Sequence, residues 1–183
     1  GELLMNQRKS LKELNLLDKF LFDEAMDDPE NVKTMLDIIL SQNTNLKHPP
    51  QTEKEQRTST DNRQIRLDVY AIDEDDVIYE VEAQKENTHN LPKRSRLYQG
   101  IIDSKLLPPG VVDFNLLNEV LIVLIMPFDL FGYGLYRYTF QMRCEEVPEL
   151  KLDDGATRIF LNTRGIHPEL VTGADRTLEV YGT

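Results

Sequence analysis

The sequence predicts an α/β (α+β) fold in which one mixed β-sheet is flanked by helices. Three observations support this fold class. Helical periodicity comes first along the chain, at residues 11 to 40. Two alternating segments follow between residues 66 and 84, and a continuous apolar run lies at residues 120 to 128. The chain contains no internal repeat and no domain boundary that we can identify, so we expect residues 1 to 183 to form a single domain.

Two helices are expected before the first strand. The first covers residues 11 to 27, where leucine and phenylalanine recur near one face. For the second, Asp28 is a suitable N-cap, Pro29 suits the first turn, and apolar residues follow at helical spacing. Residues 43 to 63 are polar and contain two adjacent prolines. We therefore expect a loop or a frayed edge strand there.

A β-hairpin is predicted next. Residues 66 to 72 and 77 to 84 each alternate between apolar and polar, and the DEDD sequence between them is typical of a turn. A three-residue loop in that turn pairs Asp68 with Glu82 across the two strands. The same register places the apolar side chains of both strands on one face, as a core requires.

The second half of the chain is expected to supply one helix and three strands. The helix begins near Asn90 and continues toward the prolines at residues 108 and 109. The run at residues 120 to 128 is predicted to be a buried strand, because it is apolar throughout and rich in leucine and β-branched residues. Further strands are expected at residues 135 to 143 and 157 to 163, with a glycine-containing bend before the first of them.

Composition limits the classes of function. The formal net charge is −11, which argues against a protein that bulk charge holds to nucleic acid. It still allows an enzyme in which metal ions and a local basic patch meet the phosphates. The single cysteine, Cys144, excludes an intrachain disulfide and fits a reducing compartment. The sequence has no apolar run of about 18 residues and no signal peptide, so we expect a cytoplasmic protein without membrane contact.

The polar face of the hairpin allows two interpretations. Asp68, Glu80, Glu82 and Gln84 share this face in the predicted register. Opposed carboxylates repel each other unless a cation lies between them, and oxygen ligands of this kind suit Mg²⁺ or Mn²⁺. The face is therefore either a metal site or an ordinary solvated surface, and the pattern alone leaves both open.

The spacing of these residues resembles that of a nuclease family. Asp68 is followed fourteen residues later by Glu82-Ala83-Gln84, and then by the sequence LPKRSRLYQ. This pattern resembles the PD-(D/E)XK nuclease superfamily. It is more closely similar to the bacterial group of recombination-promoting nucleases and putative transposases, the Rpn family, which runs D…(I/V)ExQ…KRxxxYQ. The segments FLFDEAMDDPEN and DGATRIFLNTRG also resemble that family, and the similarity covers most of residues 17 to 165.

The resemblance implies a fold and an activity. The fold is a restriction-endonuclease-like core with the catalytic face on the central hairpin. The activity is metal-dependent hydrolysis of DNA phosphodiester bonds, with Mg²⁺ or Mn²⁺ as cofactor, in recombination or transposition. Asp68 and Glu82 match the metal-binding acids, and Gln84 completes the catalytic set where the superfamily usually has lysine. Because members often continue past the NTRG region, we expect this chain to be truncated at its C-terminal end.

The helix after the hairpin supplies the expected substrate contacts. Arg94 lies four residues before Tyr98 on the helical stripe that faces the sheet. We assign both residues to substrate binding, with Arg94 holding a phosphate group near the metal. The alternative is a partly buried arginine that pairs with Glu80 or Glu86.

Other interpretations of the same sequence remain open. An acidic residue of the early helices, such as Glu30 or Asp37, would be available to complete the site. The absent lysine and the acidic net charge also suit a catalytically silent domain of the same fold that binds nucleic acid or protein. DNA is the expected partner in the first case, and the sequence leaves a homodimer open.

Overall fold

The computed structural model describes residues 28 to 40, 43 to 52 and 69 to 166. Its helices are α2 (Pro29–Leu40), α4 (Leu91–Asp103) and the short 3₁₀ helix η2 (Phe114–Leu116). Its strands are β1 (Gln51–Thr52), β2 (Val69–Ile72), β3 (Ile78–Ala83), β4 (Val120–Met126), β5 (Arg137–Phe140) and β6 (Ala156–Asn162). The helix expected at residues 11 to 27 lies outside the described residues.

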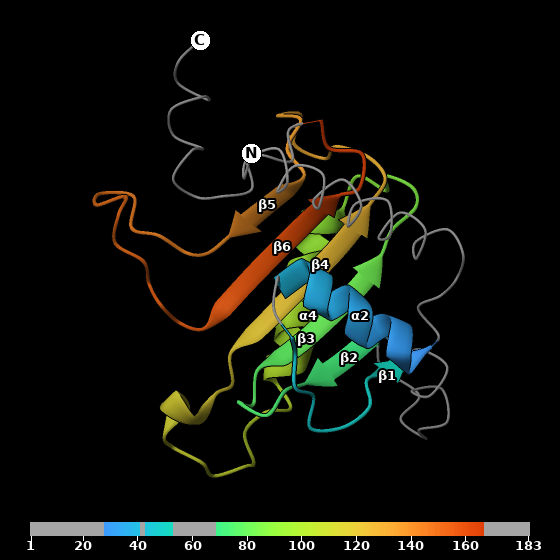
Figure 1. Ribbon diagram of the computed structural model, residues 1–183. Coiled ribbons are helices and arrows are strands. Elements are labelled where there is room, and N and C mark those ends of the chain that lie inside the picture. The colour runs from blue at the N-terminus through green and yellow to red at the C-terminus, as the bar shows by residue number, and fades with distance from the viewer. Residues whose placement is uncertain (1–27, 41–42, 53–68, 167–183) are drawn as a thin grey trace, which may run out of the picture.

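The described strands form one mixed sheet of six, in the order β1-β2-β3-β4-β6-β5. β3, β4 and β6 are parallel to one another, whereas β1, β2 and β5 pair antiparallel at the two sides. Helix α2 covers one face of this sheet and helix α4 covers the other (Figure 1). The predicted mixed α/β class, with a mixed sheet flanked by helices, is therefore confirmed. No described helix is both long enough and apolar enough to cross a membrane.

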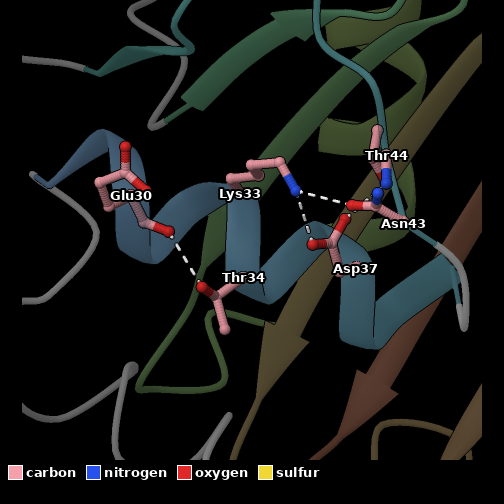
Figure 2. A network of polar contacts seen from close by, with 6 residues as sticks. All are labelled: Glu30, Lys33, Thr34, Asp37, Asn43 and Thr44. Atoms are coloured by element: carbon pink, nitrogen blue, oxygen red, sulfur yellow. Dashed lines mark hydrogen bonds and ion pairs between the residues drawn. The ribbon is translucent and has the colours of Figure 1, made fainter.

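Helix α2 begins as the sequence predicts. The side chain of Asp28 accepts a hydrogen bond from the backbone N–H of Glu30 at 3.0 Å, which satisfies one of the free donors of the first turn. At the other end, Asp37 accepts bonds from the Nζ of Lys33 at 2.9 Å and from the N–H of Thr44 at 2.6 Å. Lys33 also donates to Asn43, so this polar network fastens α2 to the chain that follows it (Figure 2).

The hairpin of β2 and β3 has the predicted register. Val69 pairs with Val81, and Ile72 pairs with Ile78. The turn between the strands is held by Asp73, whose carboxylate accepts bonds from two backbone N–H groups and from the hydroxyl of Tyr79 at 2.6 Å. Such a side chain-to-backbone bond is why aspartate favours turns.

Two hydrophobic cores lie on opposite faces of the sheet. The core under α2 contains four residues of the helix together with alternate residues of the strands. Its members are Val32, Met35, Leu36, Ile39, Val69, Ala71, Tyr79, Val81, Val123, Ile125, Tyr136, Ile159 and Leu161. The second core lies under α4 and contains the alternate residues of β4 that point to the other face of the sheet. The long apolar run at residues 120 to 128 is therefore explained, because β4 is buried on both of its faces.

Helix α4 begins where the sequence predicts, at Leu91, but it lacks the expected cap bond and ends earlier than expected. Asn90 is the N-cap residue, but its side chain makes no capping hydrogen bond and instead accepts one from the hydroxyl of Thr88. The helix ends at Asp103, before the prolines at residues 108 and 109. The hydroxyl of Ser104 donates to the carbonyl of Ile101, and such local bonding competes with continuation of a helix.

Candidate functional site

The polar face of β3 is buried, so the interpretation of this face as solvated is wrong. Glu80 has 0% of its surface exposed and Glu82 has 3%. Both point to the face of the sheet that α4 covers, opposite to their neighbours Tyr79 and Val81. Two ionisable side chains taken out of water require compensation, so this face is a place where specific partners are expected.

Arg94 of α4 joins the residues that the sequence singled out. Its Nη2 atom forms an ion pair with Oε1 of Glu82. Its Nη1 atom donates to Oε1 of Gln84 at 3.2 Å, and its Nε atom donates to the hydroxyl of Tyr98 at 2.7 Å. The guanidinium carbon also lies 5.6 Å from the centre of the Tyr98 ring. We call Glu82, Gln84, Arg94 and Tyr98 the Arg94 cluster.

The chain connection explains why these residues meet. β3 and β4 are parallel, so the chain must return along the sheet between them, and α4 makes this return. The beginning of α4 therefore lies beside the end of β3, and Arg94 in its first turns reaches Glu82 and Gln84. Arg94 pairs with Glu82, whereas the alternative considered from the sequence was a pair with Glu80 or Glu86. The sequence signal was present, because a crossover helix places its first turn beside the last residues of the preceding strand.

Gln84 is oriented by two further bonds. Its backbone N–H donates to the carbonyl of Ile125 at 2.9 Å, which continues the pairing of β3 with β4. Its side-chain Nε2 donates to the carbonyl of Glu86 at 2.8 Å. The amide oxygen is thereby left to face Arg94, and this fixes which end of the amide lies in the cluster.

Tyr98 is a neutral member of the cluster. Burial raises the pKa of its hydroxyl to about 12, helped by the nearby Glu82 carboxylate and opposed by the Arg94 guanidinium. At neutral pH the phenol is therefore protonated. It can accept a hydrogen bond from Arg94 and donate one of its own, but it cannot serve as a resting general base.

The donor set allows a magnesium ion in the cluster. The carboxylate of Glu82 and the amide oxygen of Gln84 both contact one cationic group, and hard oxygen atoms of this kind are the ligands that Mg²⁺ takes. Asp68, the other predicted metal ligand, lies outside the described residues. Among the residues described, no three acids, histidines or cysteines gather as a complete metal set. Mg²⁺ usually takes one or two carboxylates and completes its shell with water and phosphate, so this donor set fits.

The acids of the second helix lie away from the cluster. Glu30 and Asp37 belong to α2, which packs on the face of the sheet opposite to Glu82. Asp37 is committed to Lys33 and Thr44, and these bonds overcome the effect of burial and hold its pKa below the usual value (Figure 2). Neither acid completes the site in this arrangement.

The complete burial of Glu80 was not predicted from the sequence. The sequence groups Glu80 with the other polar residues of β3 but says nothing of what covers them, and α4 leaves it fully inaccessible. Glu82 lies two residues after Glu80 on the same face of β3, and its carboxylate contacts the half-buried Arg94 of α4. The partly exposed side of the site is therefore at Gln84 and Arg94.

No protein-family model matches the chain, and a search of the curated proteins finds no significant match. The class that the fold and the site define is a mixed α/β protein with a carboxylate, an amide, a guanidinium and a phenol in contact at the end of a central strand. These four groups define the chemistry that the site can perform.

Proposed function

We propose that the protein is a metal-dependent DNA endonuclease with a restriction-endonuclease-like core, which hydrolyses phosphodiester bonds in recombination or transposition. The observation that carries the proposal is the Arg94 cluster, in which Arg94 contacts three other side chains named from the sequence, Glu82, Gln84 and Tyr98. The resemblance of the sequence motifs to those of the Rpn family is a second reason to propose this activity.

Each residue of the cluster has a role in this proposal. Glu82 and Asp68 would hold Mg²⁺ or Mn²⁺, which would supply a water of lowered pKa and an electrophile for a phosphate oxygen. Gln84 positions the attacking water or the phosphate through its amide, which carries no charge. Arg94 binds a non-bridging phosphate oxygen, because a guanidinium suits phosphate geometry. Tyr98 positions Arg94 through the hydroxyl that accepts from Nε.

The location of Arg94 is suited to this task. Its side chain is 34% exposed, whereas that of Glu82 is 4% exposed, so the guanidinium spans the distance from the buried acid to the surface. Lys93 and Arg96 of the same helix are exposed as well. A local group of positive charges can therefore attract DNA to a protein whose net charge is −11.

Nicking of supercoiled plasmid DNA tests the activity. We expect the wild type to nick the plasmid with Mg²⁺ or Mn²⁺ and to be inactive in EDTA. Glu82→Gln and Asp68→Asn should abolish nicking, because each removes a charge that would hold the cation. Glu86→Gln is the matched control, since Glu86 is exposed on the same segment and should leave the rate unchanged. Nicking that continues undiminished in Glu82→Gln would rule out the assignment.

A catalytically silent binding domain is the second candidate. The ion pair with Arg94 favours it, because this contact already compensates the charge of Glu82 without a metal ion. Such a domain would retard DNA equally well in EDTA and in Mg²⁺, and retardation would fall steeply with added salt. Absence of nicking together with metal-independent retardation would favour this candidate over the nuclease.

A further inference from the structure

We propose that Arg94 and the divalent cation compete for the same oxygen atoms, so that Arg94 is an internal latch that a metal ion must release. The inference rests on the proposed function, because it concerns how the nuclease site is loaded. It goes beyond that function by giving the site a closed state and an open state. In the closed state Arg94 holds Glu82 and Gln84, and in the open state its guanidinium is available to a phosphate.

The contacts of Arg94 carry this argument. Two of its nitrogen atoms are directed at the oxygens of Glu82 and Gln84, which are the described atoms best suited to a divalent cation. The Arg94 guanidinium and a divalent cation are both positively charged, so they repel each other when both lie against the Glu82 carboxylate, and the guanidinium also occupies oxygen lone pairs that a metal ion would take. Binding of one therefore weakens binding of the other.

Burial makes the competition strong. The side chain of Glu82 is only 4% exposed, so its charge attracts a nearby cation more strongly than a surface carboxylate would. The closed state satisfies this attraction internally. A metal ion must replace it, and the metal affinity of the free protein is reduced by the free energy of the Arg94 contacts.

A released Arg94 has a second use. Its side chain is one-third exposed at 34%, and it begins in the first turns of α4, so the guanidinium can turn outward by side-chain rotation alone. A DNA phosphate offers oxygen acceptors in place of those that the metal takes. DNA and metal should therefore favour each other's binding, since each stabilises the open state.

The experiment measures Mn²⁺ binding from the electron paramagnetic resonance signal of free Mn²⁺, with no DNA present. The full chain is compared with Arg94→Gln, Arg96→Gln and Glu82→Gln. Arg96→Gln is the matched control, because it removes the same charge from an exposed position of the same helix. We expect Arg94→Gln to bind Mn²⁺ about tenfold more tightly than the wild type. Arg96→Gln should bind like the wild type, and Glu82→Gln should lose binding.

The outcomes separate the inference from the proposed function. If Arg94→Gln binds Mn²⁺ with unchanged or weaker affinity while Glu82→Gln loses it, the metal site stands and the latch is overturned. If no variant binds Mn²⁺, the metal-dependent function and the latch are both overturned. A second measurement on the wild type avoids any effect of the substitution on folding. The Nη–H groups of Arg94, which contact Glu82 and Gln84, should lose their protection from solvent exchange in NMR spectra as Mg²⁺ is added, and retained protection in the metal-bound protein would also overturn the latch.

Discussion

Glu82 and Arg94 illustrate what a buried charge requires of its neighbours. The carboxylate lies under α4, and its ion pair with Arg94 offsets part of the cost of removing it from water. The guanidinium also bonds Gln84 and Tyr98, so in the closed state three side chains hold it. The same contacts that support a function therefore contribute to the stability of the fold.

A double-mutant cycle measures this coupling. Arg94→Gln alone should lower the free energy of unfolding, because it leaves the Glu82 carboxylate without its guanidinium partner. In the Glu82→Gln background the same change should cost less, giving a coupling energy of about 1–2 kcal/mol by urea unfolding at neutral pH. Arg96→Gln, combined with Glu82→Gln, is the control pair and should be additive. Additive values for the Arg94 pair as well would show that Arg94 and Glu82 do not stabilise each other.

For individual residues, the sequence predicts which side chains belong to the site but not which of them are in contact. Alternation along β3 places Glu80, Glu82 and Gln84 on one face, and helical spacing places Arg94 and Tyr98 on one stripe. The burial of that face depends on which helix covers it, and alternation carries no such information. The partner of Arg94 depends on the return of α4 along the sheet, which is a property of the chain connection.

At the scale of elements, the connection between β4 and β5 is held by a single carboxylate. Asp129 accepts hydrogen bonds from the backbone N–H groups of Phe131, Gly132 and Gly134, at 3.2, 3.0 and 2.7 Å. It also accepts from the hydroxyl of Tyr138 at 2.7 Å. Gly132 and Gly134 have positive φ angles of 82° and 71°, so this tight path uses the freedom of glycine.

The pH dependence of stability should report on this connection. Burial alone would raise the pKa of Asp129, but the bonds from Tyr138 and the three N–H groups hold its pKa below the usual value. A pKa that is lowered in the folded state stabilises the fold above the unfolded pKa of about 3.9 and loses this contribution as pH falls through the folded value.

We therefore expect Asp129→Asn to lower the free energy of unfolding by about 1–3 kcal/mol at pH 7, and by less below about pH 4. Urea unfolding at a series of pH values measures the difference. Asp113→Asn is the control, since Asp113 accepts one backbone bond in an exposed turn. A cost for Asp129→Asn that stays the same from pH 7 to pH 3 would show that its charge does not matter.

The helices and strands were predicted from the sequence more completely than the contacts of the site. The register of the hairpin follows from the length of its turn and from the need to bury one face, and β4 follows from an uninterrupted apolar run. The end of α4 could not be predicted, because Pro108 and Pro109 show where a helix must already have stopped, not where it stops. The helix ends at Asp103, and the hydroxyl of Ser104 just beyond it bonds the carbonyl of Ile101.

At the scale of the whole described sheet, β4 links the two hydrophobic cores. Its residues alternate between them, with Val123 and Ile125 on the side of α2, and Ile122 and Leu124 on the side of α4. Loss of either core exposes one face of this central strand. Since a parallel strand depends on burial of both faces, the two cores should unfold together.

Leucine truncations on the two faces test this cooperativity. Leu36 of α2 and Leu124 of β4 are both 0% exposed and lie in different cores. Leu36→Ala and Leu124→Ala should each lower the free energy of unfolding by about 2–5 kcal/mol in a single urea transition with an unchanged slope. Leu97→Ala is the control, because this side chain is 51% exposed on α4 and its loss should change stability by less than about 0.5 kcal/mol. Two separate transitions, each moved by only one of the buried substitutions, would mean that the cores are independent.

The Arg94 cluster, which lies on the α4 side, could then lose its structure while α2 remained folded, and metal loading would be sensitive to Leu124→Ala but not to Leu36→Ala. A single transition instead ties the site to the whole sheet, so that both truncations weaken it through global stability alone.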